Sequence, residues 1–105
     1  MKNLETALIP AIIQDSTSKD ILMMGYMNTE ALKKTIMGPN VWFYSRSKKR
    51  LWEKGETSKN YLEVVNITTD CDKDVLLITV NPKGPTCHTG EKVCFHDTNL
   101  EELNF

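Results

Sequence analysis

The fold of this chain is decided by two apolar stretches, Ile9-Pro10-Ala11-Ile12-Ile13-Gln14 and Ile21-Leu22-Met23-Met24-Gly25-Tyr26-Met27. Both are rich in apolar and β-branched residues, a composition that favours strands. Residues 15–20 between them are all polar, with the sequence Asp-Ser-Thr-Ser-Lys-Asp, as expected of a turn. The two stretches are therefore predicted to pair as an antiparallel β-hairpin.

A short helix is predicted directly after this hairpin. Asn28 is a suitable N-cap, apolar residues recur at helical spacing over residues 29–37, and Gly38-Pro39 supplies a stop signal. The other segments are predicted as strands at residues 41–44, 61–69, 75–80 and 93–95, a long polar functional loop at 45–60, and an acidic tail at 97–105 that could dock as a helical turn. The expected fold class is α+β, a mostly antiparallel β-sheet with one or two short helices.

Length and composition predict one cytoplasmic domain. A chain of 105 residues is of ordinary size for a single domain spanning residues 1–105, and 40% hydrophobic with 26% charged residues is typical of globular proteins. The formal net charge of −1 gives the protein as a whole no electrostatic reason to bind nucleic acid or an anionic membrane. The sequence shows neither a signal-peptide pattern nor a run of about 18 apolar residues. A cytoplasmic protein without nucleic-acid or membrane partners is therefore expected.

The segment Asp70-Cys71-Asp72-Lys73-Asp74 is the first candidate site. In an extended backbone alternate side chains point to opposite faces, so the aspartates would share one face and Cys71 would take the other. Carboxylates crowded in this way repel one another unless a hard cation such as magnesium or calcium neutralises them. The segment is thus a candidate divalent-cation site, and a solvated turn between strands is the alternative.

The cysteines form the second candidate site. There are three, an odd number, and in a reducing compartment thiols or metal ligands are more common than disulfides. Cys71, Cys87 and Cys94 offer the soft ligand set that suits zinc, with a fourth position open or filled by His88. Three protein ligands with one exchangeable position is the catalytic pattern. Buried apolar thiols without metal are the alternative, because none of the spacings is the two-residue gap of zinc ribbons.

Two histidines lie beside these cysteines. His88 follows Cys87 directly, and because imidazole exchanges protons near neutral pH it could act as a ligand, a general base or a proton shuttle. An inert surface residue is the alternative. His96, two residues after Cys94, is interpreted as a structural or surface group. His88 is therefore the candidate catalytic residue.

Residues 42–58 contain the candidate substrate-binding groups. The basic run from Ser45 to Arg50, with hydroxyls between the cations, could hold phosphate through charge-assisted hydrogen bonds. The tryptophans could stack on a planar base, and the polar groups of residues 54–58 could bind ribose or phosphate. A solvated charged loop and core tryptophans are the alternatives. The candidate residues are Trp42, Ser45, Arg46, Trp52, Lys54, Glu56, Thr57 and Ser58.

Five ordered motifs resemble the phosphoribosyl-AMP cyclohydrolases of histidine biosynthesis. They are Leu22-Met23-Met24-Gly25-Tyr26-Met27-Asn28, Trp42-Phe43-Tyr44-Ser45-Arg46-Ser47, Leu51-Trp52-Glu53-Lys54-Gly55-Glu56-Thr57-Ser58, Asp70-Cys71-Asp72-Lys73-Asp74 and Gly84-Pro85-Thr86-Cys87-His88-Thr89-Gly90. The resemblance implies hydrolytic opening of the adenine ring of 1-(5-phosphoribosyl)-AMP at the N1–C6 bond, the third step of the pathway. Many relatives carry a second, pyrophosphohydrolase domain, whereas this chain is expected to perform only the ring opening.

The resemblance also implies an intertwined homodimer with one Zn²⁺ and one Mg²⁺ per subunit. Zinc would lie between Cys71 of one subunit and the Cys87 and Cys94 thiols of the other, and magnesium would lie at the three aspartates. His88 would move the proton of the attacking water. The sequence departs from the family pattern with Lys59 where glycine is usual, Gly25 where alanine is common and Val93 where serine is frequent. These departures concern loop geometry rather than the metal ligands.

Two other functions compete with this hypothesis. One is a small zinc-stabilised module that binds nucleic acid through residues 46–50 and Trp52. The net charge of −1 speaks against it. The other is a dimer without enzymatic activity, whose shared metal only joins the subunits. The latter differs from the enzyme in predicting no loss of function when His88 is changed.

Overall fold

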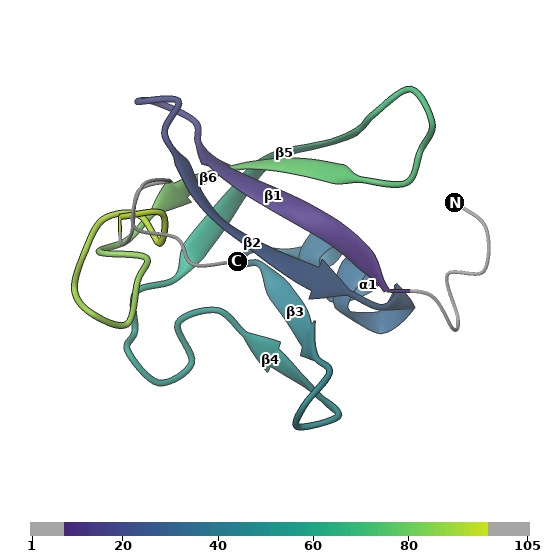
Figure 1. Ribbon diagram of the computed structural model, residues 1–105, viewed down its shortest axis with the longest axis horizontal. Helices are drawn as coiled ribbons and strands as arrows, with labels where there is room; N and C mark the ends of the chain where they lie inside the picture. Colours follow the sequence, from purple (N-terminus) through teal and green to yellow (C-terminus); the bar gives the residue numbers. More distant parts are fainter. Residues whose placement is uncertain (1–7, 97–105) are drawn as a thin grey trace, which may run out of the picture.

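The computed structural model describes residues 8–96, which form one helix and six strands (Figure 1). In chain order these are β1 (Ile9–Asp15), β2 (Ile21–Met27), α1 (Thr29–Met37), β3 (Trp42–Ser45), β4 (Arg50–Glu53), β5 (Leu62–Thr69) and β6 (Leu76–Pro82). The strands form a four-stranded sheet of order β2-β1-β6-β5 and a two-stranded sheet of β3 and β4. The predicted α+β class is confirmed.

The four-stranded sheet is mostly antiparallel. β1 and β2 pair antiparallel with Ile9 opposite Met27, so the predicted hairpin is confirmed. β5 and β6 also pair antiparallel. β1 and β6, in the centre of the sheet, run parallel with Ala11 opposite Leu76. This pairing brings two distant parts of the sequence together and had no local signal in the sequence.

The predicted helix is confirmed as α1, and it is fixed at both ends. The Asn28 side chain accepts a hydrogen bond from the Ala31 N–H (2.9 Å). Gly38 ends the helix with a φ of 71°, a conformation that glycine adopts without strain. The buried Thr35 hydroxyl donates to the Ala31 carbonyl (2.8 Å) and accepts from the Trp42 N–H (2.9 Å). These bonds hold α1 against β3.

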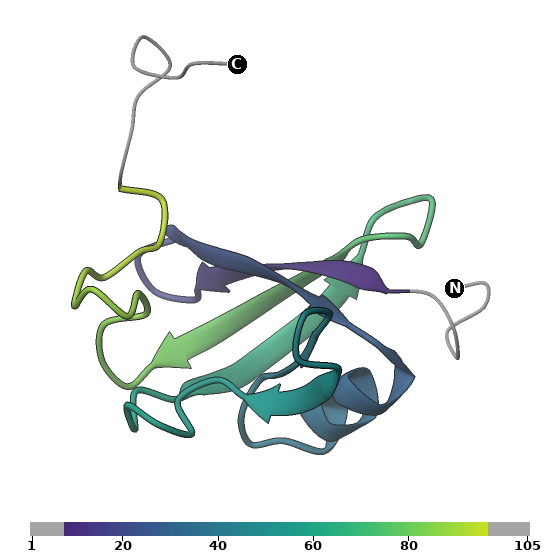
Figure 2. The same ribbon diagram turned by 60° about the horizontal axis from the view of Figure 1, so that its bottom comes forward.

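One face of the main sheet carries the core. α1 and the β3–β4 hairpin lie on the same side of this sheet (Figure 2). Alternate residues of β1 and β6 are buried, as expected of strands with one covered face. The buried hydrophobic residues are Ile9, Ala11, Ile13, Leu22, Met23, Met27, Ala31, Val41, Phe43, Leu62, Leu76, Ile78 and Val80. On the opposite face, Met24 and Leu77 flank Ile12 and keep 43% and 38% of their surface exposed.

The prediction of one long loop over residues 45–60 is wrong. β4 lies inside this range and pairs antiparallel with β3, with Phe43 opposite Trp52. The two aromatic rings are 5.1 Å apart between centroids. Because cross-strand aromatic pairs stabilise a sheet, this contact outweighs the polar composition of the flanking residues.

The strand predicted at residues 93–95 is also not formed. Cys94 donates one backbone hydrogen bond to the Leu22 carbonyl (2.7 Å), and the segment makes no ladder. The helical turn predicted at 97–105 lies outside the described residues. Within residues 8–96 the only helix, α1, is too short and too polar to cross a membrane.

Asp15, at the end of β1, is expected to make stability depend on pH. It is only 7% exposed, and its Oδ1 accepts the N–H groups of Thr17 (2.8 Å) and Ser18 (3.2 Å). The Thr17 hydrogen bond chiefly holds the pKa of Asp15 below its usual value. The stabilisation is therefore present above the unfolded-state pKa of about 3.9 and is lost as pH falls through the lower folded-state value.

Asp15→Asn is accordingly expected to lower the free energy of unfolding by about 1–2 kcal/mol at pH 7 and to have a smaller effect near pH 3. Urea denaturation of the metal-free protein across this range measures both. Glu91→Gln, which changes an exposed carboxylate outside this turn, serves as the control. Equal losses at pH 3 and pH 7 would contradict the assignment.

Candidate functional site

Two pockets meet along β4 and the loop that follows it. The hairpin pocket, about 450 Å³, is lined by Gly25, Tyr26, Phe43, Tyr44, Ser45, Lys48, Arg50, Trp52, Glu56 and Thr57. The thiol pocket, about 390 Å³, is lined by Trp52, Glu53, Lys54, Gly55, Glu56, Thr57, Ser58, Asn60, Thr86, Cys87, His88 and Gly90. Because Trp52, Glu56 and Thr57 line both, the two pockets form one continuous candidate site.

The Cys87 sulfur is the most strongly perturbed group of the thiol pocket. The Thr89 hydroxyl donates a hydrogen bond to Cys87 Sγ (3.1 Å), and His96 Nε2 lies 3.4 Å from the same sulfur. Hydrogen bonds from the Thr89 hydroxyl, then from the Thr89 backbone and His96, lower the pKa of the Cys87 thiol to about 6. Cys87 is therefore mostly a thiolate at neutral pH, the form that binds metals and acts as a nucleophile.

Cys94 lies beside Cys87 and has the opposite tendency. Burial raises the pKa of the Cys94 thiol, and the neighbouring Cys87 raises it further. The hydrogen bond from the Cys94 side chain is one of the interactions that stabilise the Cys87 thiolate. The structure thus brings two of the three predicted zinc ligands together.

Cys71 does not join this pair within one chain. It is exposed in the turn between β5 and β6, at the end of the main sheet away from the thiol pocket (Figure 1). Within residues 8–96, the only three metal-ligating side chains that converge belong to the aspartate cluster, and no cysteine is among them. A three-thiol site therefore requires a second chain.

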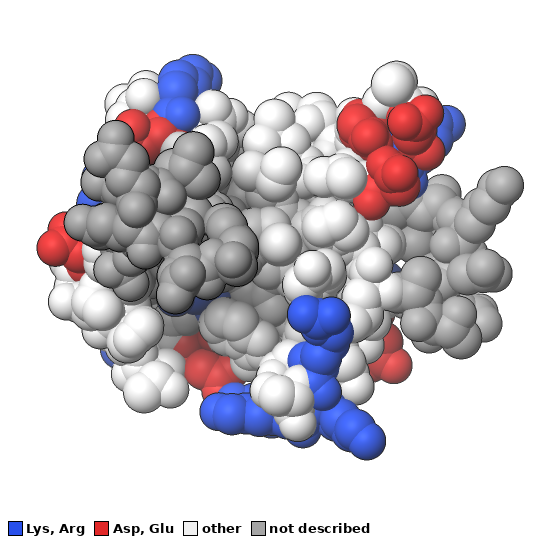
Figure 3. Space-filling model, viewed as in Figure 1, with Lys and Arg blue, Asp and Glu red and all other residues white. Residues whose placement is uncertain are grey.

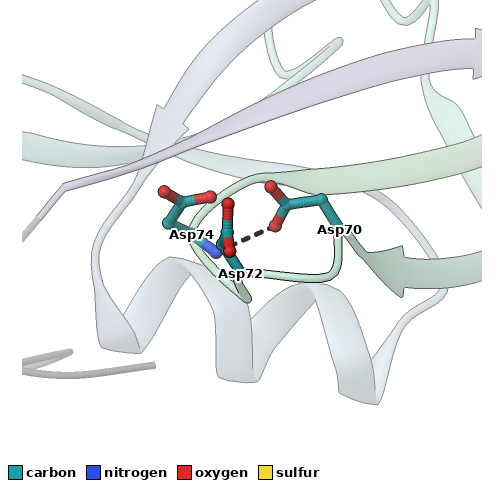
Figure 4. A group of neighbouring side chains, drawn as sticks. All are labelled: Asp70, Asp72 and Asp74. Carbon is teal, nitrogen blue, oxygen red and sulfur yellow. Dashed lines mark hydrogen bonds between the residues drawn. The ribbon is translucent and has the colours of Figure 1, made fainter.

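The aspartate cluster Asp70, Asp72 and Asp74 surrounds a small space in the β5–β6 turn (Figure 4). Oxygen atoms of the three carboxylates lie within 4.8 Å of one another. The backbone is a turn rather than extended, with Lys73 at a φ of 60°, so the alternation argument was wrong although the carboxylates do converge. Hard oxygen donors gathered in this way can hold a divalent cation such as magnesium or calcium.

Two aspartates of this cluster are coupled electrostatically. Asp70 accepts the N–H groups of Asp74 (3.0 Å) and Val75 (3.3 Å). The Asp74 backbone hydrogen bond lowers the pKa of Asp70, whereas the Asp70 side chain raises the pKa of Asp74. Ionised Asp70 therefore disfavours ionisation of Asp74, as expected of carboxylates close enough to share one cation.

Both histidines lie close to the Cys87 sulfur. His88 is exposed and lines the thiol pocket, with Nδ1 4.0 Å from Cys87 Sγ. His96, interpreted as a structural or surface group, also contacts Cys87, and its Nε2 lies 3.3 Å from the Thr89 hydroxyl. The signal that could have found it is the Cys94-Phe95-His96 spacing, which places an imidazole two residues after a thiol.

Six of the eight predicted substrate-binding residues line these pockets. Ser45 lines the hairpin pocket, Lys54 and Ser58 line the thiol pocket, and Trp52, Glu56 and Thr57 line both. The Arg46 guanidinium instead stacks on the Tyr26 ring at 4.4 Å, at the edge of the hairpin pocket. Trp42 lines neither pocket, and the Lys34 ammonium lies 4.8 Å from its ring centroid.

Glu56 shapes the site through two intramolecular contacts. One carboxylate oxygen accepts the Glu53 N–H (2.8 Å), and the other pairs with the Arg50 guanidinium (3.1 Å). The Arg50 hydrogen bond is the main reason that the pKa of Glu56 is lowered. These two contacts tie β4 to the loop that follows it.

The loop after β4 depends on backbone conformations that favour glycine. Gly55 has a φ of 100°, and a Cβ there would lie 2.8 Å from the Tyr61 backbone. Lys59, which stands where the resembling family usually has glycine, has a φ of 68° and donates its N–H to the Gly55 carbonyl (2.7 Å). The loop that carries Lys54 and Ser58 is thus tightly closed.

Gly55→Ala is expected to destabilise the protein by about 2–3 kcal/mol, because the Cβ meets backbone that has little room to move. Gly90→Ala is a matched control: Gly90 also has a positive φ, 94°, but a Cβ there meets nothing within 4 Å. Thermal and urea unfolding of both variants measure the difference. Equal effects would show that backbone strain alone, without the collision, accounts for the loss.

Comparison with known proteins identifies one matching family and several similar proteins. The family model described as phosphoribosyl-AMP cyclohydrolase matches residues 23–96. A phosphoribosyl-AMP cyclohydrolase of Clostridium botulinum is 56% identical over 85% of this chain and 82% of that protein. Histidine biosynthesis bifunctional proteins HisIE of Shigella sonnei and Vibrio cholerae are 59% and 58% identical over 87% and 90% of the chain. The chain spans 45% of the length of these two bifunctional relatives.

Proposed function

The chain belongs to the phosphoribosyl-AMP cyclohydrolase family, and from this premise we propose that it acts as one domain that opens the adenine ring of 1-(5-phosphoribosyl)-AMP at the N1–C6 bond. The observation that carries the proposal is the thiol pocket. It is lined by Cys87, whose pKa is lowered, together with His88 and Lys54. A ring-opening hydrolase needs a means to activate water, a group that moves its proton and cations that hold phosphate. This pocket contains candidates for each.

Zinc is the metal that we propose for the thiols. Cys87 as a thiolate, with Cys94 beside it, is a suitable donor pair, and an exposed Cys71 from a second chain would complete the soft ligand set. When bound, zinc would act as a Lewis acid and lower the pKa of a water molecule in the site. The thiols must stay reduced for this role, which is the reason to expect the cytoplasm as the compartment.

The separation of the thiols is the reason to propose a homodimer. Cys71 lies at one end of the main sheet, and Cys87 and Cys94 lie near the other (Figure 1). A two-fold axis perpendicular to the line between these ends would place two identical sheets in opposite directions, with each Cys71 near the Cys87–Cys94 pair of the other subunit. The zinc site would then form twice in the dimer, once for each chain.

The outer face of the main sheet is the surface that we propose for this contact. Ile12, Met24 and Leu77 form an apolar row across β2, β1 and β6, and uncharged surface covers the middle of β1 (Figure 3). Acidic side chains gather near the end of this face where the β5–β6 turn lies. An apolar centre with charged ends is a pattern that suits docking of a second copy.

The residues of the pocket have separate roles in the proposed reaction. The oxygen of the attacking water would bond to C6 while His88 takes one of its protons, and the proton would pass to N1 as the N1–C6 bond breaks. The Lys54 ammonium and the Ser58 hydroxyl would hold a phosphate group. The Trp52 face, which borders both pockets, would stack on the base.

Magnesium is proposed for the aspartate cluster. Because this cation retains waters and prefers phosphate oxygens, we assign it to binding a substrate phosphate rather than to the attack. The cluster lies beside Cys71, so in the proposed dimer it would approach the thiol pocket of the partner subunit. Its carboxylates would thus add a second charged contact to the nucleotide.

The direct test of this function is turnover of 1-(5-phosphoribosyl)-AMP, followed by ultraviolet absorbance as the ring opens. The protein loaded with zinc and magnesium is expected to convert the substrate, and a chelator is expected to stop the conversion reversibly. If the protein shows no activity with any metal but binds single-stranded nucleic acid, the small zinc-stabilised nucleic-acid-binding module would be favoured instead.

A further inference from the structure

We propose that Lys92 is a positioning residue for the Cys87 and Cys94 thiols, acting through an ion-pair network with the β1–β2 turn. The inference rests on the zinc site proposed above. It concerns a residue outside the motifs that carry the family resemblance and outside both pockets. Lys92 touches neither the substrate pocket nor the proposed metal, so its role is to place the residues that do.

The segment that carries the thiols has little regular structure. Residues 83–96 contain no helix or strand, so a few hydrogen bonds define their path. The Thr86 N–H donates to the Lys92 carbonyl and the Cys87 N–H donates to the Glu91 carbonyl, both at 3.1 Å. These bonds close the segment on itself, but they do not attach it to the sheet.

The Lys92 side chain supplies one such attachment. Its ammonium lies 2.8 Å from Asp20 Oδ2, 3.0 Å from Ser18 Oγ and 3.5 Å from Asp15 Oδ2. These acceptors lie 72 to 77 positions earlier in the sequence, in the turn that joins β1 to β2. One side chain thus ties the thiol segment to the rigid end of the main sheet.

Two of the three residues that accept from Lys92, Asp15 and Ser18, are held by other hydrogen bonds of the turn. Asp15 is almost completely buried and accepts the Thr17 and Ser18 N–H groups, and the Ser18 hydroxyl accepts the Asp20 N–H at 3.2 Å. An isolated surface ion pair contributes little because ordering two mobile side chains is costly. Here Asp15 and Ser18 are held by hydrogen bonds within the turn, so fewer side chains have to be ordered than in an isolated network; the Asp20 and Lys92 side chains remain about half exposed.

The position of Lys92 along the chain explains why its anchoring affects both thiols. It lies between Cys87 and Cys94, and two residues later the Cys94 N–H bonds the Leu22 carbonyl of β2 (2.7 Å). The two attachments hold the segment at neighbouring points on the same hairpin. A metal that binds thiols held in this way does not have to order the loop, which increases its affinity.

The test is the zinc affinity of purified full-length Lys92→Met, measured by competition with a chromophoric chelator. We expect affinity to fall about tenfold, in the range seen when groups that support metal ligands are removed. Lys92→Arg keeps the charge and several N–H donors, so its affinity should stay within about threefold of wild type. Lys83→Met, which removes the Lys83–Glu63 ion pair (3.4 Å) at the first residue of the same segment, is the matched control and should bind zinc normally.

Cobalt substitution and hydrogen exchange separate positioning from general stability. The thiolate-to-cobalt absorption bands should change in Lys92→Met and return in Lys92→Arg, and the Cys94 amide of metal-free Lys92→Met should exchange faster than in wild type. Wild-type zinc affinity in Lys92→Met, or a loss that Lys92→Arg does not restore, overturns the inference about Lys92 alone. A wild-type protein that binds no zinc overturns the zinc proposal and this inference with it.

Discussion

Cys87→Ser is expected to remove zinc and to reduce ring opening at least about 100-fold, because the variant loses the thiolate that is already formed at neutral pH. A serine hydroxyl at this position stays protonated and is a poor ligand for a soft metal site. Zinc content by atomic absorption and turnover of phosphoribosyl-AMP should fall together. Glu91→Gln, an exposed change in the same segment, should leave both unchanged.

The two measurements must agree for the metal to be catalytic. A wild-type preparation that is fully active without zinc would remove the metal from the reaction. Conversely, Cys87→Ser that keeps turnover while losing zinc would reduce the thiols to a structural role. The Cys87 thiolate would then need another explanation.

His88→Ala is expected to lower kcat by about 10²–10⁴-fold while zinc content stays at the wild-type level, because the imidazole moves a proton and is not needed to hold the metal. His96→Gln is the matched control, since His96 is the other imidazole in contact with Cys87. It should change zinc affinity more than kcat at saturating zinc. Steady-state kinetics and metal analysis of the two variants separate these roles.

Added imidazole gives a second test of His88. If the pocket accommodates it, free imidazole should restore part of the His88→Ala activity and none of the Cys87→Ser activity. Zinc loss from His88→Ala in proportion to its activity loss would contradict the assignment and make His88 a ligand. Unchanged turnover would favour a dimer without catalytic function.

The local elements were predictable because their signals lie close together in the sequence. The β1–β2 hairpin was read from two apolar stretches around a polar turn, and α1 from the Asn28 cap and the Gly38 stop. Each of these signals acts over a few residues. The structure confirms both elements near the predicted boundaries.

The elements that the sequence did not reveal depend on contacts between distant residues. The parallel pairing of β1 with β6 joins segments at the two ends of the described chain. β4 is stabilised by the Phe43–Trp52 contact, although its neighbours have the composition of a loop. Such tertiary contacts override local propensity and have no signature in a short window of sequence.

The sequence predicted which residues are candidates for the site, but it predicted their arrangement in space less well. Thiols, carboxylates and His88 were identified from their chemistry and their family resemblance, and the structure places His88 and Cys87 in one pocket. The aspartates converge through a turn rather than an extended strand. The contacts of His96 with Cys87 and of Lys92 with Asp20 were missed, because these partners are defined by the folded path of residues 83–96.

The central claim is that one reaction centre is built from two chains, and a mixing experiment tests it most directly. Cys71→Ser and Cys94→Ser homodimers should each be inactive, since each lacks a thiol in both sites. Co-refolded in equal amounts, half of the dimers would contain one intact site of two, so about a quarter of wild-type activity should return. A mixture no more active than its components, from chains shown to form mixed dimers, would contradict a zinc site shared between subunits.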